Sequence, residues 1–198
     1  MNDLNFAERI RDIFSDSIQT LINAADALPE KINHAGSILV QSILNDNKIL
    51  SCGNGGSGFE ASRFASKLLN RFEMERPPLP ALALNTDKAS LSSIANDYDY
   101  SQVFAKQIQA LGRKGDVLLA ITSSGNSSSI IEAIAAAQNK NMAIIALTGN
   151  NGGRLRSLLK PDNIEISVPG NSAARVQECH QVIIHALCDM IDMHLFGL

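Results

Sequence analysis

Apolar and polar positions along the chain follow a helical period first and a strand-like pattern afterwards. Residues 4–27 predict an amphipathic helix, because apolar side chains recur every three or four positions. These side chains are Phe6, Ile10, Ile13, Phe14, Ile18, Leu21 and Ile22. Pro29 ends or restarts this helix, and a second helix is expected over 30–46. Both helices carry more apolar surface than they can cover, so we expect this pair, 1–46, to pack against another subunit.

Five short apolar runs of strand length follow the helical pair. They occupy 48–52, 80–84, 117–121, 142–147 and 164–168. Helices are expected between and after them, over 57–71, 88–95, 102–111, 127–139, 152–160 and 173–196. Strands that alternate with helices need crossover connections, which produce a parallel sheet covered by helices on both faces. The sequence therefore predicts one α/β domain over 1–198, with its α/β core at 47–198.

Composition excludes several classes of protein. The 198 residues are 45% hydrophobic and 19% charged, with a formal net charge of −3, which is typical of a soluble globular domain. Without a basic excess, direct binding to nucleic acid is not expected. No apolar stretch is long enough for a membrane span, and we expect a cytoplasmic protein. The three cysteines at 52, 179 and 188 show no pairing pattern, which fits a reducing compartment.

Two loops rich in glycine and serine carry the candidate chemistry. One lies at 51–57 and the other at 122–128, and each joins a predicted strand to a predicted helix. A glycine-rich turn that opens a helix presents backbone N–H groups at the positive end of the helix dipole, and serine hydroxyls add neutral donors. The two loops favour a phosphorylated, hydroxyl-rich ligand. The alternative is that the serines only cap the helices.

The first loop also matches a dinucleotide-binding pattern. Residues 53–58 read Gly-x-Gly-x-x-Gly after a strand. That pattern needs an acidic residue at the end of the next strand, but Glu73 lies in a predicted loop and Asp87 is too far along. The second serine-rich loop, which a dinucleotide site does not need, favours a sugar phosphate instead.

Six motifs give the chain a resemblance to a known family over nearly its full length. They are Gly53-Asn-Gly-Gly-Ser57, Ala95-Asn-Asp97, Gly115-Asp-Val-Leu-Leu119, Ser124-Gly-Asn-Ser127, Leu147-Thr-Gly149 with Gly152-Gly153, and Arg175-Val-Gln-Glu178. They resemble the sugar isomerase (SIS) domain, and within it the phosphoheptose isomerase group with its DiaA-like branch. The resemblance implies a flavodoxin-like three-layer sandwich with a five-stranded parallel sheet and extra N-terminal helices. It also implies a homotetramer with sites between subunits.

The same resemblance implies roles for individual residues. Thr122, Ser123, Ser124 and Ser127 would hold the phosphate, and Asn54 and Ser57 would line the sugar side. The remaining substrate-binding candidates are Gly55, Asp97 and Gln177.

A metal site is implied only in part. The active isomerases that the chain resembles place a His and a Glu one turn apart on the helix after the first loop, and a Gln and a His on the last helix. Gln177 and His185 supply the second pair here, but Arg63 and Lys67 stand at the positions of the first. We therefore expect no cofactor, with zinc only in an active isomerase, and His185 as the candidate catalytic base.

Two functions remain open. Segments such as 17–20, 70–73, 84–87 and 187–189 are similar to DiaA, which implies a regulator that binds the replication initiator DnaA and has weak or lost isomerase activity. Leu195 and Phe196, expected to be exposed, would offer a protein contact. The alternative is an active phosphoheptose isomerase, which converts sedoheptulose 7-phosphate to D-glycero-D-manno-heptose 7-phosphate for the heptose of the lipopolysaccharide core.

Overall fold

The fold is built around one five-stranded parallel sheet. The computed structural model describes residues 5–170 and 172–197. The strands are β1 (Ile49–Gly53), β2 (Ala81–Ala83), β3 (Val117–Ile121), β4 (Ala143–Gly149) and β5 (Ile164–Val168). Their order in the sheet is β2-β1-β3-β4-β5, and all pairs are parallel. The predicted parallel sheet is confirmed, with strand ends within two residues of those expected.

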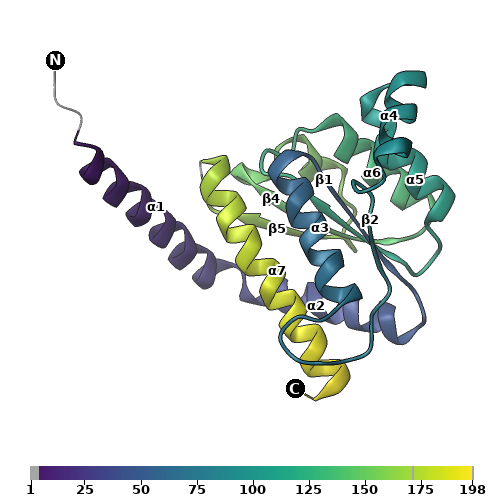
Figure 1. The fold of residues 1–198 in the computed structure, drawn as a ribbon, viewed down its shortest axis with the longest axis horizontal. Helices are drawn as coiled ribbons and strands as arrows, with labels where there is room; N and C mark the ends of the chain where they lie inside the picture. Colours follow the sequence, from purple (N-terminus) through teal and green to yellow (C-terminus); the bar gives the residue numbers. More distant parts are fainter. Residues whose placement is uncertain (1–4, 171, 198) are drawn as a thin grey trace.

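Helices cover both faces of this sheet, as Figure 1 shows. The α-helices of the described residues are α1 (Phe6–Ala27), α2 (Pro29–Leu44), α3 (Gly55–Leu69), α4 (Lys88–Asp97), α5 (Val103–Leu111), α6 (Ser128–Asn139) and α7 (Ala173–Phe196). The same residues include the 3₁₀ segments η1 (Tyr100–Gln102) and η2 (Asn150–Leu158). α2, α3 and α7 pack on one face and α5 and α6 on the other. The arrangement is the expected flavodoxin-like three-layer sandwich.

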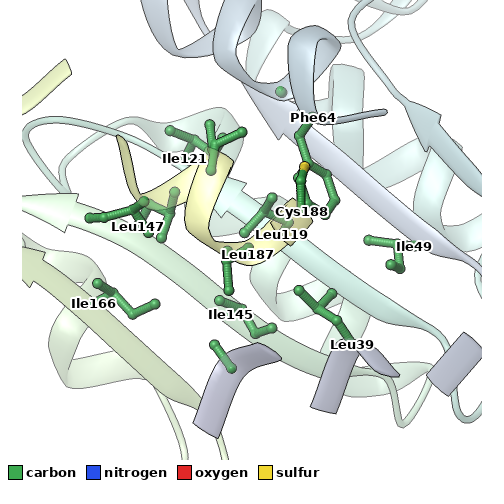
Figure 2. Packing of buried hydrophobic residues seen from close by; sticks show 14 of the residues in the cluster. Leu39, Ile49, Phe64, Leu119, Ile121, Ile145, Leu147, Ile166, Leu187 and Cys188 are labelled. Atoms are coloured by element: carbon green, nitrogen blue, oxygen red, sulfur yellow. The ribbon is translucent and has the colours of Figure 1, made fainter. Parts of the chain in front are cut away.

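Alternate residues of each strand divide the core in two. On β3, Leu119 and Ile121 face α3 and α7, whereas Leu118 and Ala120 face α5 and α6. All four are fully buried, as is typical of a parallel sheet whose strands are covered on both sides. Figure 2 shows the first of these layers, in which Phe64 of α3 packs beside the last helix.

One predicted helix is wrong in type. An α-helix was expected over 152–160, but the structure has the 3₁₀ segment η2 over 150–158. Its backbone is interrupted by left-handed conformations at Asn151, Gly152 and Gly153, with φ of 61°, 81° and 56°. A run of three such residues cannot continue an α-helix.

The first helix is largely without partners inside the subunit. α1 buries only Ala24, and six of its apolar side chains are 39–72% exposed: Phe6, Ile10, Ile13, Phe14, Ile18 and Ile22. Figure 1 shows α1 extending away from the sheet. Its last turns pack near α7, and Arg175 of α7 also donates to the carbonyl oxygen of Ile13 at 2.8 Å. The predicted amphipathic pattern is present, but within the described residues only Leu21 and Ala24 of its apolar face pack against the core cluster.

The C-terminal side chains differ from expectation. Leu195 and Phe196 are half-buried against the core cluster and do not form the exposed contact expected from the sequence. Within the described residues, no helix combines the length and hydrophobicity that crossing a membrane requires.

A buried ion pair fixes the end of α3 to α7. Arg76 donates from Nε to Asp192 Oδ1 at 2.9 Å, and the two side chains are 1% and 7% exposed. The same guanidinium also donates to the carbonyl oxygens of Lys67 at 2.8 Å and Leu68 at 2.7 Å. The last turn of α3 is therefore held by a side chain from the loop that follows it.

We expect Arg76→Met to lower the free energy of unfolding by about 3–5 kcal/mol, because it leaves the buried Asp192 carboxylate without its partner. Urea denaturation followed by circular dichroism measures this loss. Arg71→Met is the matched control, since Arg71 pairs with Glu75 at the surface and should cost less than about 1 kcal/mol. Equal stability of the two variants would contradict the prediction.

Candidate functional site

A polar pocket lies where the carboxyl ends of β1 and β3 meet. This is the point at which the chain has crossed from one side of the sheet to the other, where open α/β sheets bind their ligands. The pocket has a volume of about 170 Å³. Its lining consists of Asn54, Ser57, Ile121, Thr122, Ser123, Ser124, Ser127 and Gln177. All of these except Ile121 are predicted ligand-binding residues.

The first loop closes tightly around the start of α3. A side chain at Gly53 would overlap with the Ser57 carbonyl, and Gly55 has a φ of +52°, so both positions favour glycine. A side chain at Gly56 would come within 2.8 Å of the Gln177 amide. Glycine at this position therefore allows Gln177 of α7 to reach the N-terminus of α3. Gly55 itself lies outside the pocket lining, and its role as a substrate-binding residue stays a prediction.

The second loop is locked against the loop after β4. Gly125 has a φ of +66°, and a Cβ there would overlap with the Gly152 carbonyl. The Leu155 N–H donates to the Gly125 carbonyl at 2.9 Å, and the Arg154 N–H donates to Asn126 Oδ1 at 3.0 Å. This close approach explains the left-handed backbone of η2, which replaces the expected helix.

A network centred on Asn54 joins three separate segments. Its amide nitrogen donates to Ser127 Oγ at 2.7 Å and to Ser129 Oγ at 2.8 Å. Its amide oxygen accepts from the Tyr100 hydroxyl at 3.1 Å. Ser129 and Tyr100 are not among the residues predicted from the sequence. Ser129 directly follows the second loop and could have been included, whereas no local pattern marks Tyr100.

Asp97 is not among the residues that line the pocket. It is the last residue of α4, is exposed, and accepts a hydrogen bond from Asn96 Nδ2 at 3.1 Å. Its role as a substrate-binding residue therefore stays a prediction.

The two cations predicted at the metal positions lie close to His185. Lys67 Nζ is 5.2 Å from the centre of the Phe72 ring, which lies 5.5 Å from the His185 ring. The pKa of His185 is lowered, first by burial and then by the positive charges of Lys67 and Arg63, while Glu73 raises it. This environment favours a neutral imidazole with two cations beside it.

These residues do not fit a zinc site. Gln177 and His185 are acceptable ligands, but Arg63 and Lys67 are cations that repel Zn²⁺ and offer it no lone pair. Across residues 5–170 and 172–197, no group of three or more His, Cys, Asp and Glu side chains is placed to hold a metal ion. No step through a metal is therefore derived for this chain.

His180 and Glu60 form a buried pair behind the pocket. His180 is fully buried, with Nε2 3.0 Å from the Thr148 carbonyl oxygen and Nδ1 3.5 Å from Glu60 Oε2. A carbonyl oxygen can only accept, so Nε2 carries the proton. The structure thus places His180 in the core and not in the lining of the pocket.

Comparison with known proteins identifies the family of this chain. The family model of the SIS domain matches residues 13–149. Phosphoheptose isomerases of Shewanella frigidimarina and Shewanella oneidensis are each 56% identical over 189 residues, which are 96% of this chain and 96% of each relative. Two solved structures are also similar. A phosphoheptose isomerase from Francisella tularensis has a TM-score of 0.94 and 47% identity over 96% of this chain and 100% of its own. Phosphoheptose isomerase GmhA from Neisseria gonorrhoeae has a TM-score of 0.90 and 44% identity over 95% and 99%.

The match of the family model over 13–149 and the 56% identity to relatives over 96% of the chain show that the chain belongs to the SIS domain family. Within that family its similarity is to the phosphoheptose isomerases, over nearly the whole length of both.

Proposed function

We propose that this protein is a phosphoheptose isomerase, which binds sedoheptulose 7-phosphate and converts it to the aldose D-glycero-D-manno-heptose 7-phosphate. The observation that carries the proposal is the pocket whose lining contains seven of the predicted binding residues, in a chain 56% identical to relatives named for this activity. Cytoplasmic heptose synthesis for lipopolysaccharide is the role that this activity implies.

The hydrogen-bond donors of the pocket are suited to bind a phosphate group. None of its lining residues is charged, and the backbone N–H groups at the starts of α3 and α6 lie beside it. Helix N-termini attract anions, and serine and threonine hydroxyls can each donate to a phosphate oxygen. A dianion held in this way leaves the uncharged sugar chain to extend along α3 and α7.

The isomerisation needs a base and a group that stabilises the enediolate. In the proposed reaction the His185 imidazole takes a proton from C1 of the ketose and returns it to C2, while the O1 hydroxyl proton passes to O2. The lowered pKa of His185 keeps it neutral at pH 7 and able to accept this proton. Arg63 and Lys67 would stabilise the negative charge of the enediolate. Arg63 is six residues after Ser57, or about 9 Å along the helix, within reach of an extended sugar.

A second candidate is a regulator that binds the initiator DnaA. The observation that favours it is the presence of Arg63 and Lys67 where the resembled isomerases have metal ligands. In this case the pocket still binds a sugar phosphate, but the chain has little turnover and works through a partner protein. The segments similar to DiaA support this candidate.

Self-association also belongs to the proposal. The exposed apolar face of α1 supports packing against other copies of the chain, and we propose a homotetramer with sites between subunits. No direct contact with nucleic acid or membrane is proposed.

For the isomerase, we expect His185→Gln to reduce kcat by about 10²-fold or more, because the proton between C1 and C2 loses its base. Detection of the aldose product by NMR measures turnover of sedoheptulose 7-phosphate. His194→Gln is the matched control, since His194 is exposed on the same helix and bonds only to the Met190 carbonyl among the described contacts. Wild-type protein with bound ligand but no turnover would contradict the isomerase proposal.

The double variant Arg63→His/Lys67→Glu separates the two candidates. If the cations stabilise the enediolate, it should lose about 10²-fold in kcat, with or without added zinc. A strong gain of activity with zinc, measured in the same assay, would instead indicate a degraded metal site and favour the regulator.

For the regulator, we expect immobilised protein to retain purified DnaA. A pull-down at physiological salt measures this, with the phosphoheptose isomerase of Neisseria gonorrhoeae as the control bait. Absence of retention above that control would exclude the DnaA-binding function.

For self-association, we expect a tetramer by size-exclusion chromatography with light scattering. Ile10→Glu/Phe14→Glu should reduce the mass, because it places charges on the exposed apolar face of α1. Asp12→Lys/Gln19→Lys changes the charge of the same helix on the face opposite the apolar residues and should leave the mass unchanged. A monomeric wild type would contradict this expectation.

A further inference from the structure

We propose that Tyr100 is a positioning residue for the phosphate, because its hydroxyl begins a directed chain of hydrogen bonds that ends on Ser127 in the pocket. This inference rests on the proposed function, since it requires a phosphate ligand between the two serine-rich loops. It assigns a specificity role to a side chain outside the family motifs.

The first links of the chain have a fixed direction. An amide oxygen only accepts, so the Tyr100 hydroxyl donates its proton to Asn54 Oδ1 at 3.1 Å. An amide nitrogen only donates, and Asn54 directs its two protons to Ser127 Oγ at 2.7 Å and Ser129 Oγ at 2.8 Å. Both serine oxygens therefore act as acceptors toward Asn54 and keep their own protons.

The last link of the chain orients the Ser127 hydroxyl as a hydrogen-bond donor toward the pocket. Ser129 is 2% exposed, does not line the pocket, and lies 3.2 Å from Ser127 Oγ, a contact in which either hydroxyl can donate. In the proposed chain Ser129 is the donor, because Ser127 is the one that faces the pocket and its ligand. Ser127 lines the pocket, and its oxygen is now occupied by two donors. The hydroxyl proton of Ser127 is then directed to the ligand, because a phosphate dianion presents only acceptors. Each bond polarises the next, which strengthens the final donor.

Tyr100 is placed so that its hydroxyl matters more for binding than for folding. It lies in η1 and is 53% exposed. The preceding helix α4 buries none of its residues, so little of the core depends on this segment. In contrast, Asn54 lies in the turn that opens α3. The hydroxyl thus connects an exposed segment to the most constrained part of the site.

The experiment compares Tyr100→Phe with Tyr98→Phe. Removal of the Tyr100 hydroxyl should weaken the binding of sedoheptulose 7-phosphate and of inorganic phosphate by about 3- to 10-fold, measured by isothermal titration calorimetry. In turnover, the KM should rise while kcat stays unchanged, and the thermal midpoint should not move. Tyr98 is a close match, because it is 64% exposed and lies two residues away. The centre of its ring is 3.8 Å from Lys106 Nζ, so it serves as a tyrosine outside the Asn54 network. Tyr98→Phe should bind as the wild type does.

A double-mutant cycle tests the chain itself. Ser129→Ala should weaken binding by a similar factor, and Tyr100→Phe/Ser129→Ala should lose little more than either single variant, because both substitutions interrupt one chain. Fully additive losses would overturn the proposal.

Failure of this inference differs from failure of the proposed function. If Ser127→Ala weakens phosphate binding but Tyr100→Phe does not, the pocket is the phosphate site and the role of Tyr100 is overturned. If the wild type binds neither inorganic phosphate nor sedoheptulose 7-phosphate, the proposed function and the role of Tyr100 are both overturned.

Discussion

The site depends on the close approach of two loops at the carboxyl edge of the sheet. Gly125 and Gly152 meet backbone to backbone, and no side chain fits between them. The bond from the Leu155 N–H to the Gly125 carbonyl then holds the loops together. Because Ser124 and Ser127 flank Gly125 on either side, their hydroxyls are placed by this contact. The pocket is thus shaped by the backbone, and its serines are free to donate to a ligand.

Two contacts hold α3 against α7 beside this pocket. Gly56 lets Gln177 reach the start of α3, and the Arg76–Asp192 pair holds the other end of α3 to α7. Between these two contacts lie Arg63 and Lys67, whose positive charges act on His185. The pocket lining is neutral and rich in hydroxyls, whereas this stretch of α3 is cationic. The two parts of α3 therefore differ in their electrostatic environment.

The fold could be predicted from the sequence because strand and helix periods are distinct and glycines mark the turns. The pocket residues Asn54, Ser57 and Ser127 could be assigned because they lie in loops that follow strands. The 3₁₀ conformation of η2 could not be predicted, because its left-handed backbone results from the contact between Gly152 and Gly125, which are 27 residues apart in the sequence. The position of Tyr100 beside Asn54 likewise depends on a contact 46 residues apart in sequence. The half-burial of Phe196 was missed because its packing partners come from distant elements.

The three cysteines have a consequence for how this protein meets oxidants. Burial raises the pKa values of Cys52 and Cys188 to about 12 and that of Cys179 to about 11. A thiol with a pKa near 12 is ionised in only ~1 in 10⁵ molecules at pH 7, and the thiolate is the species that peroxides and alkylating agents attack. The three thiols should therefore stay unmodified during oxidative stress, when enzymes with exposed thiolates lose activity.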